Sequence, residues 1–138
     1  MPELLSGHES GQKRQYILTS TPKKKLEYQI YVSNLLIKDG FTPFIEVKFI
    51  SEYSSREKRI EVVGIKNNQI KLHQFTSRAS FDQDANELNR LISEISSSSI
   101  AKGYKIYGEI ILLENVENLD VLEQALKDMN IDISITRL

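Results

Sequence analysis

A short hairpin signal constrains the fold of this chain more than any other feature of its sequence. Residues 59–66 and 69–75 both alternate between apolar and polar side chains, and only Asn67-Asn68 separates them. Asparagine tolerates the positive φ angle that a two-residue turn requires, so the pattern predicts an antiparallel hairpin. Counting outward from the turn then places Glu61 directly opposite Gln74.

The other elements are predicted from hydrophobic periodicity and capping residues on either side of the hairpin. Thr21 followed by Pro22 indicates the start of a first helix, and Ser80 with Gln83 predicts a capping box at the start of a second. The predicted elements are a helix at 21–40, a strand at 41–53, the hairpin, a helix at 80–95, a strand at 104–114, a helix at 118–129 and a strand at 131–138.

The order αβββαβαβ is typical of an α/β fold, a mixed β-sheet with flanking helices. A right-handed crossover through the second helix predicts that the strands before and after it are parallel. Ile45, Val47 and Phe49 are expected on one face of the first strand. The expected buried stripe of the first helix is Leu26, Ile30, Tyr31, Leu35 and Leu36.

Length and composition set the expected domain organisation. A chain of 138 residues, 40% of them hydrophobic, can bury one globular core. Residues 1–20 lack periodicity and are expected to form a mobile tail, and residues 21–138 a single α/β domain. No apolar run approaches the roughly 20 residues that span a bilayer, and no signal peptide is recognised, so a cytoplasmic protein without a membrane partner is expected. The chain has no cysteine, which excludes thiolate zinc sites and leaves any metal among oxygen ligands.

The element order over residues 24–114 resembles the core of the PD-(D/E)XK (restriction endonuclease-like) nuclease superfamily. In that superfamily an acidic residue opens the second strand, and an acid-x-lysine triplet lies across the hairpin on the third. Glu61 falls at the first acidic position, Gln74 at the second and Thr76 at the lysine. Glu27 resembles an extra acid that some members carry on the first helix. The resemblance implies that Glu61 and Glu27 would hold Mg²⁺, and the changes at the other two positions predict a degenerate site.

A second acid-x-lysine triplet is formed by Glu46 and Lys48, which are expected on the same face of the first strand. Its upstream acid would be Asp39, seven residues earlier, which leaves no room for the intervening strand. Glu46 and Lys48 could instead approach Glu61 from the neighbouring strand, with Lys48 replacing the missing lysine. A half-exposed strand with alternating charges is the simpler interpretation. His73 is expected on the face opposite Glu61, as a packed or surface histidine rather than a ligand.

The net charge of −1 hides an uneven distribution. Residues 13–78 contain 13 basic and 6 acidic residues, whereas residues 79–138 contain 5 basic and 11 acidic residues. A basic region can contact nucleic-acid phosphates, or it can simply be a solvated face. The candidate phosphate-binding residues are Lys23, Lys24, Lys25, Lys48, Arg56, Lys58, Arg59 and Arg78.

The sequence supports three hypotheses about function. The first is a nuclease-like nucleic-acid-binding domain with a degenerate, inactive metal site and DNA as the expected partner. The second is an active Mg²⁺-dependent endonuclease that uses Glu61, Gln74, Glu46 and Lys48. The third is a protein-interaction or assembly module whose last strand pairs with a second copy to form a homodimer. The small size also fits an accessory protein of a virus or another mobile element.

Overall fold

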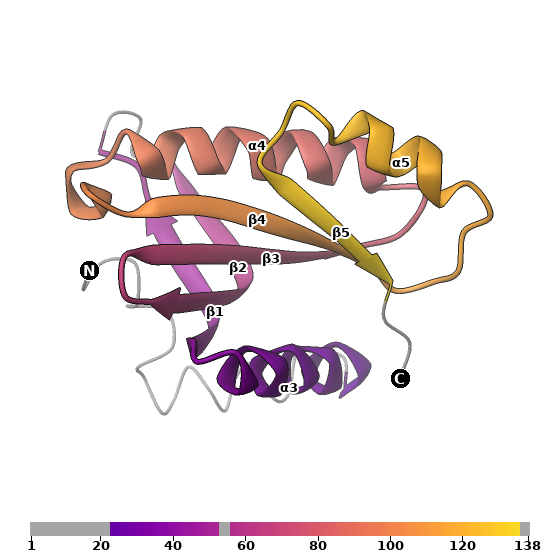
Figure 1. Ribbon diagram of the computed structural model, residues 1–138, viewed down its shortest axis with the longest axis horizontal. Helices are drawn as coiled ribbons and strands as arrows, with labels where there is room; N and C mark the ends of the chain where they lie inside the picture. The colour runs from indigo at the N-terminus through magenta and orange to yellow at the C-terminus, as the bar shows by residue number, and fades with distance from the viewer. Residues whose placement is uncertain (1–22, 53–55, 136–138) are drawn as a thin grey trace.

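The computed structural model describes residues 23–52 and 56–135. Five strands form one sheet in the order β1-β2-β3-β4-β5, with α3 on one face and α4 and α5 on the other (Figure 1). The elements are α3 (Lys23–Lys38), β1 (Thr42–Ile50), β2 (Glu57–Lys66), β3 (Gln69–Thr76), α4 (Phe81–Ser96), the 3-10 helix η2 (Ser99–Ala101), β4 (Lys105–Leu112), α5 (Leu119–Ala125) and β5 (Ile131–Ile135).

The sheet is mixed, as the sequence predicts. The strands β1, β2 and β3 are antiparallel neighbours, whereas β3, β4 and β5 run parallel. The predicted order of elements and the parallel pair around α4 are therefore confirmed. The predicted tail at residues 1–20 and the helix start at Thr21 and Pro22 lie outside the described residues.

The hairpin forms in the predicted register, but its ladder stops early. Asn67 has the positive φ, 51°, expected at the turn. Backbone pairing continues as far as Val62 and His73. One step further, the backbone N–H of Glu61 donates to Oε1 of the Gln74 side chain at 3.0 Å. Glu61 and Gln74 are neighbours, as counting predicts, but a side-chain amide replaces the backbone acceptor.

Two apolar clusters hold the layers together. The larger lies between the sheet and the helices α4 and α5, and the smaller lies between the sheet and α3. An added Cβ would lie 2.9 Å from Leu88 at Gly108, and 2.7 Å from Leu36 at Gly64. A glycine on each face therefore lets a helix pack directly against the sheet. The buried members of the smaller cluster are Val32, Leu36, Val62 and Ile111.

The strand β1 changes face halfway along its length. Ile45 packs in the smaller cluster, whereas Val47 and Phe49 belong to the larger one. The prediction that these three residues share a face is therefore wrong. The change occurs at Glu46, which has a φ of 53° and interrupts the pairing with β2. Because a positive φ is uncommon outside glycine, the two-residue period gave no sign of it.

The strand β2 changes face at the same level. Ile60 belongs to the larger cluster and Val62 to the smaller one, with Glu61 between them. Both acidic side chains, Glu46 and Glu61, consequently turn toward α3, where each contacts Gln29. The reversal therefore brings two carboxylates from neighbouring strands to the same place.

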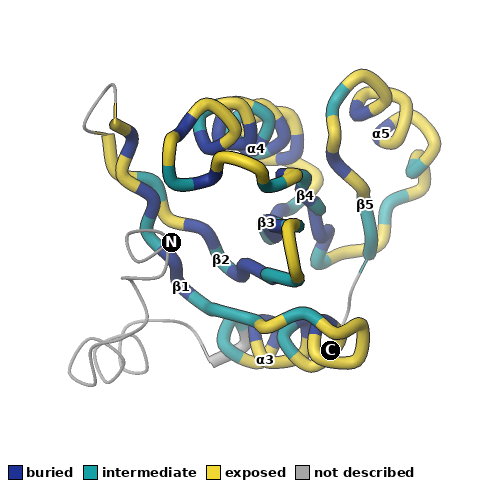
Figure 2. The backbone as a smooth tube through the Cα atoms, turned by 60° about the vertical axis from the view of Figure 1, so that its left-hand side comes forward, coloured by how far each residue is buried: buried dark blue, intermediate teal, exposed yellow. Residues whose placement is uncertain are grey.

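The helix α3 buries a different stripe from the predicted one. Leu36 is buried as expected, but Ile30, Tyr31 and Leu35 are 50%, 41% and 43% exposed. Figure 2 shows α3 alone on its face of the sheet, with exposed residues along its outer side. Its buried residues are Tyr28, Gln29, Val32 and Leu36. The polar Gln29 thus lies within the buried stripe.

Several predicted boundaries also need correction. The helix α4 starts after Ser80, as predicted, but the Ser80 side chain makes no capping hydrogen bond, so the capping box is not formed. The helix α5 ends at Ala125, short of the predicted end at residue 129. In the part of the chain that the structure describes, no helix is long and apolar enough to cross a membrane.

Candidate functional site

Two carboxylates, one amide and two basic groups meet where β1 and β2 change face. Nε2 of Gln29 on α3 donates to Oε1 of Glu46 at 2.9 Å and to Oε2 of Glu61 at 3.2 Å. Nζ of Lys25 lies 3.0 Å from the other oxygen of Glu61. Nη1 of Arg59 lies 3.4 Å from the other oxygen of Glu46. All four carboxylate oxygens thus accept a donor in this group of five residues, which we call the carboxylate cluster.

Much of the carboxylate cluster is shielded from water. Gln29 is 0% exposed and Glu46 is 3% exposed. Burial raises the pKa of the Glu61 carboxyl above its ordinary value; the charge and hydrogen bond of Lys25 oppose this rise, and the charge of Glu46 adds to it. The formal charges of the two carboxylates and the two basic side chains sum to zero.

The Gln29 amide is satisfied on one side only. Its nitrogen makes both hydrogen bonds to the carboxylates, whereas its Oε1 is buried and has no hydrogen-bond partner among the described residues. The reverse orientation would place this oxygen against two negatively charged groups. The hydrogen-bond network therefore fixes which end of the amide faces Glu46 and Glu61.

The residues at the second acidic position and at the lysine position are held by other contacts. Oε1 of Gln74 accepts the backbone N–H of Glu61, and its side chain lines a small cavity on the α4 side, next to Leu88. Thr76 is 5% exposed, and its hydroxyl donates to Oδ2 of Asp84 at 2.6 Å. Neither side chain joins the carboxylate cluster, although Gln74 touches its backbone.

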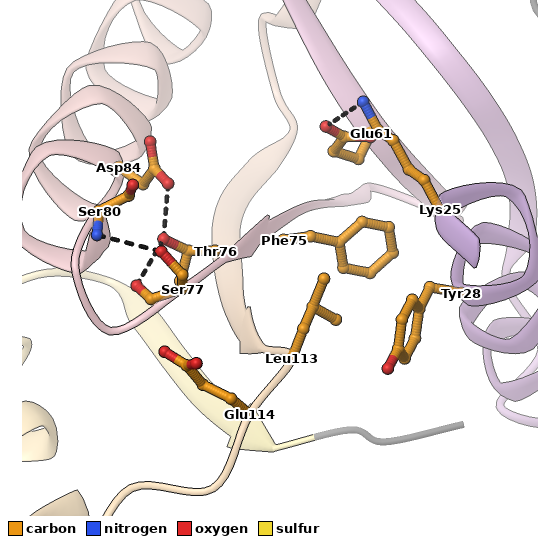
Figure 3. A pocket seen from close by; sticks show the side chains of 10 residues that line it. All are labelled: Lys25, Tyr28, Glu61, Phe75, Thr76, Ser77, Ser80, Asp84, Leu113 and Glu114. Carbon is orange, nitrogen blue, oxygen red and sulfur yellow. Dashed lines mark hydrogen bonds and ion pairs between the residues drawn. The ribbon is translucent and has the colours of Figure 1, made fainter. Parts of the chain in front are cut away.

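A cavity of about 490 Å³ lies beside the carboxylate cluster. In Figure 3 the apolar side chains of Phe75 and Leu113 lie between the Lys25–Glu61 pair and a group of polar residues near the start of α4, and Tyr28 lies beyond Phe75, below Lys25. The cavity opens at the carboxyl ends of β3 and β4, where α/β sheets commonly bind ligands. It is lined by Lys25, Tyr28, Glu61, Phe75, Thr76, Ser77, Ser80, Asp84, Leu113 and Glu114.

Some predicted site residues lie away from this cleft. Glu27 is exposed on α3 and lines none of the cavity. Nζ of Lys48 lies 3.4 Å from Glu57, and Nζ of Lys58 lies 2.8 Å from Glu87 on α4. The structure therefore brings together Glu61, Glu46, Lys25 and Arg59 but not Glu27 or Lys48.

The remaining predicted basic residues have different surroundings. The backbone N–H of Arg78 donates to Glu114 at 2.6 Å, so its backbone lies at the rim of the cleft. Arg56 is exposed in the segment before β2. The side chains of Lys23 and Lys24 lie outside the described residues.

His73 is a correction to the predicted faces. It lies on the α3 side of the sheet, as Glu61 does, because the reversal in β2 separates the two positions. His73 is 2% exposed, and its Nε2 lies 3.3 Å from Oε1 of Glu109. Burial would raise the pKa of Glu109, but the hydrogen bond and charge of His73, together with Lys71, hold it below its ordinary value. His73 is a packed histidine, as predicted.

The residues of the carboxylate cluster do not fit a divalent cation. The described residues contain no group of three or more His, Asp or Glu side chains that could hold a metal. Mg²⁺ needs free oxygen ligands in near-octahedral geometry. Here the oxygens of Glu46 and Glu61 already accept hydrogen bonds, and Lys25 and Arg59 place two positive groups where a cation would have to approach.

Comparison with known proteins supports the fold. No known protein-family model and no curated protein matches the chain. A repair endonuclease from Pyrococcus abyssi is 13% identical with a TM-score of 0.51, and the match covers 86% of this chain and 47% of that one. Can2 from Sulfobacillus thermosulfidooxidans, solved with cyclic tetra-adenylate, is 13% identical with a TM-score of 0.58, over 91% of this chain and 32% of that one. A protein of unknown function, AF1548, is 13% identical with a TM-score of 0.58, over 78% of this chain and 56% of that one.

The mixed sheet, the flanking helices and these similarities define a restriction endonuclease-like fold. This is the fold of the PD-(D/E)XK nuclease superfamily, which the sequence pattern predicts. The chain spans between about a third and a little over half of the length of the three proteins. At this level of identity the similarity establishes the fold alone.

Three residues of the site were missed by sequence reasoning. Gln29, Asp84 and Glu114 carry no motif, and their partners lie 8 to 36 positions away in the sequence. One signal for Gln29 was available, because it lies one helical turn after Lys25. Residues four apart share a helix face, so both would reach the same neighbour.

Proposed function

We propose that the chain is a nucleic-acid-binding domain on a nuclease scaffold that has lost metal-dependent hydrolysis. The observation that carries the proposal is the carboxylate cluster, in which Lys25, Gln29 and Arg59 occupy the four oxygens of Glu46 and Glu61. Phosphodiester hydrolysis on this fold needs carboxylates that are free to bind a cation. The chain retains the fold, whereas the carboxylates of Glu46 and Glu61 already have hydrogen-bond and ion-pair partners.

A basic surface at one end of β1 and β2 supports binding to phosphates. Lys48 and Arg59 are directly opposite each other in the ladder, and like charges in this position destabilise a sheet unless an anion lies between them. Arg59 is 53% exposed, and Glu57, the partner of Lys48, is 52% exposed. Exposed ion pairs contribute little stability, so a phosphate can replace Glu57 as the partner of Lys48 at small cost.

Nucleic-acid binding is tested by fluorescence anisotropy with single- and double-stranded DNA and RNA over a series of salt concentrations. We expect affinity to fall steeply with salt, because each phosphate contact contributes about 0.9 to the slope of log affinity against log salt on double-stranded DNA. Lys48→Ala and Arg56→Ala should each reduce the slope by about one. Lys127→Ala, an exposed residue after α5, is the matched control. Binding that persists unchanged in half-molar salt would contradict the proposal.

Loss of hydrolysis is tested by incubating the same substrates, and branched DNA, with Mg²⁺ or Mn²⁺. We expect no cleavage. Cleavage that disappears in Glu61→Ala would instead establish the second hypothesis, an active endonuclease centred on Glu61. Cleavage that survives Glu61→Ala would exclude Glu61 as the centre of the catalytic site.

One observation favours a second function, a protein-interaction module. The outer side of α3 exposes Ile30, Tyr31, Leu35 and Ile37 by 41% to 57%. Clusters of large exposed apolar residues are typical of protein contact sites, and β5 at the sheet edge offers a second surface. Light scattering over a hundredfold range of concentration tests self-association, and a constant monomer mass would exclude the homodimer.

A further inference from the structure

We infer that the carboxamide of Gln29 takes the place of a cation between Glu46 and Glu61. The inference goes beyond the proposed function and rests only on the fold and on the carboxylate cluster. It holds whether or not the chain binds nucleic acid. It assigns Gln29 a role that the superfamily pattern does not contain.

Glu46 and Glu61 come from neighbouring strands, and both turn toward α3 at the level where the strands change face. Two carboxylates this close, of which Glu46 is buried, repel each other unless a hydrogen-bond donor or a positive group lies between them. A Gln side-chain nitrogen carries two N–H donors, and Nε2 of Gln29 directs them to one oxygen of each carboxylate, at 2.9 Å and 3.2 Å. A single nitrogen thus bridges the two groups, as a bound cation would.

The Gln29 amide is held in this orientation at an energetic cost. Oε1 of Gln29 is buried without a partner among the described residues, and an unsatisfied buried acceptor is unfavourable. The orientation persists because the two carboxylates require the nitrogen end. The amide is neutral, so the compensating charge comes from Lys25 and Arg59.

The helix α3 presents two of the groups that contact Glu61 from one face. Lys25 and Gln29 are one turn apart, and both contact Glu61. The side of α3 that faces Glu61 therefore carries an ammonium and an amide in place of apolar side chains. Replacing the amide of Gln29 by a carboxylate should allow the cluster to bind a cation, because Gln29→Glu adds an oxygen ligand and removes the bridging donor.

The experiment compares thermal unfolding of the full chain in EDTA and in increasing Mn²⁺, with calorimetric titration of Mn²⁺ as a second readout. We expect no saturable response from the wild-type protein. Gln29→Glu should unfold at a lower temperature in EDTA and recover in Mn²⁺, with a rise of roughly 4 °C at ten times the dissociation constant. Gln124→Glu, an exposed position on α5, makes the same change of charge away from the cluster and should not respond.

A second variant keeps the test decisive if Gln29→Glu does not fold in EDTA. Gln29→Ala leaves the two carboxylates facing each other without added charge, and Mn²⁺ should raise its unfolding temperature as well. Saturable binding of Mn²⁺ by the wild-type protein would overturn the inference, because the cluster would then be a metal site already. The inference would also be overturned if Mn²⁺ changed neither the folding nor the unfolding temperature of the two variants.

Discussion

Replacing Gln29 by methionine tests how much the bridging amide contributes to stability. Methionine is similar in size but has neither the nitrogen nor the oxygen. The change removes two hydrogen bonds to carboxylates, each worth about 1.5–3 kcal/mol, and it also removes a buried unsatisfied oxygen that costs about 1–3 kcal/mol. Their difference predicts that Gln29→Met lowers the free energy of unfolding by about 2 kcal/mol.

The assay is urea unfolding at neutral pH, followed by far-ultraviolet circular dichroism because the chain has no tryptophan. With a urea dependence of about 1–3 kcal/mol per molar, the midpoint should fall by about 1 M. Gln124→Met on the exposed side of α5 is the control and should change the midpoint very little. A loss for Gln29→Met below about 0.5 kcal/mol, or one equal to that of the control, would refute the reasoning.

A double-mutant cycle separates the bridging effect from packing. In a Glu46→Gln background only one carboxylate remains beside residue 29, so Gln29→Met should cost less than it does in the wild-type protein. We expect a coupling of about 1 kcal/mol between the two positions. Strict additivity would mean that Gln29 does not respond to the charge of Glu46.

Three further predictions concern pH and packing. Because the pKa of Glu61 is raised, the folded state binds the proton of this carboxyl more tightly than the unfolded chain does. The stability of the wild-type protein relative to Glu61→Gln should therefore fall as the pH rises from 4.5 through the raised pKa. The lowered pKa of Glu109 has the opposite effect, and the advantage of the wild-type protein over Glu109→Gln should be present above pH 4.5 and disappear as pH falls below it. Urea unfolding between pH 3 and 8 tests both, and a difference that does not change with pH would contradict either one. Gly108→Ala places a Cβ 2.9 Å from Leu88 and should lower the free energy of unfolding by about 1–3 kcal/mol, whereas an unchanged midpoint in the same assay would show that α4 can shift away.

The parts of the fold that depend on neighbouring residues were predictable from the sequence. The turn at Asn67 requires a positive φ that asparagine tolerates, and helical spacing from Phe81 to Ile95 matches the buried side of α4. These signals lie within a few residues of one another. The element order, and with it the fold, therefore followed from local patterns.

The site could not be predicted in the same way, because long-range contacts determine it. The positive φ of Glu46 has no local cause, since glutamate does not favour it, and Gln29 and Arg59 contact the side chain from other elements. Counting residues by two put Glu61 next to Gln74 correctly. The same count put His73 on the wrong face, because it assumes that the strand does not change face.

The interruption at Glu46 also affects how the sheet ends. Among the described residues, β1 is an edge strand of the sheet and is nine residues long. A long regular edge is a surface on which other strands can add and start aggregation. Pro43 has no N–H to offer on this edge, and Glu46 combines a left-handed backbone with a buried charge. The same residue that brings a carboxylate to the cluster thus breaks the regular row of backbone groups along β1, which leaves the five-residue strand β5 as the more regular edge for another chain.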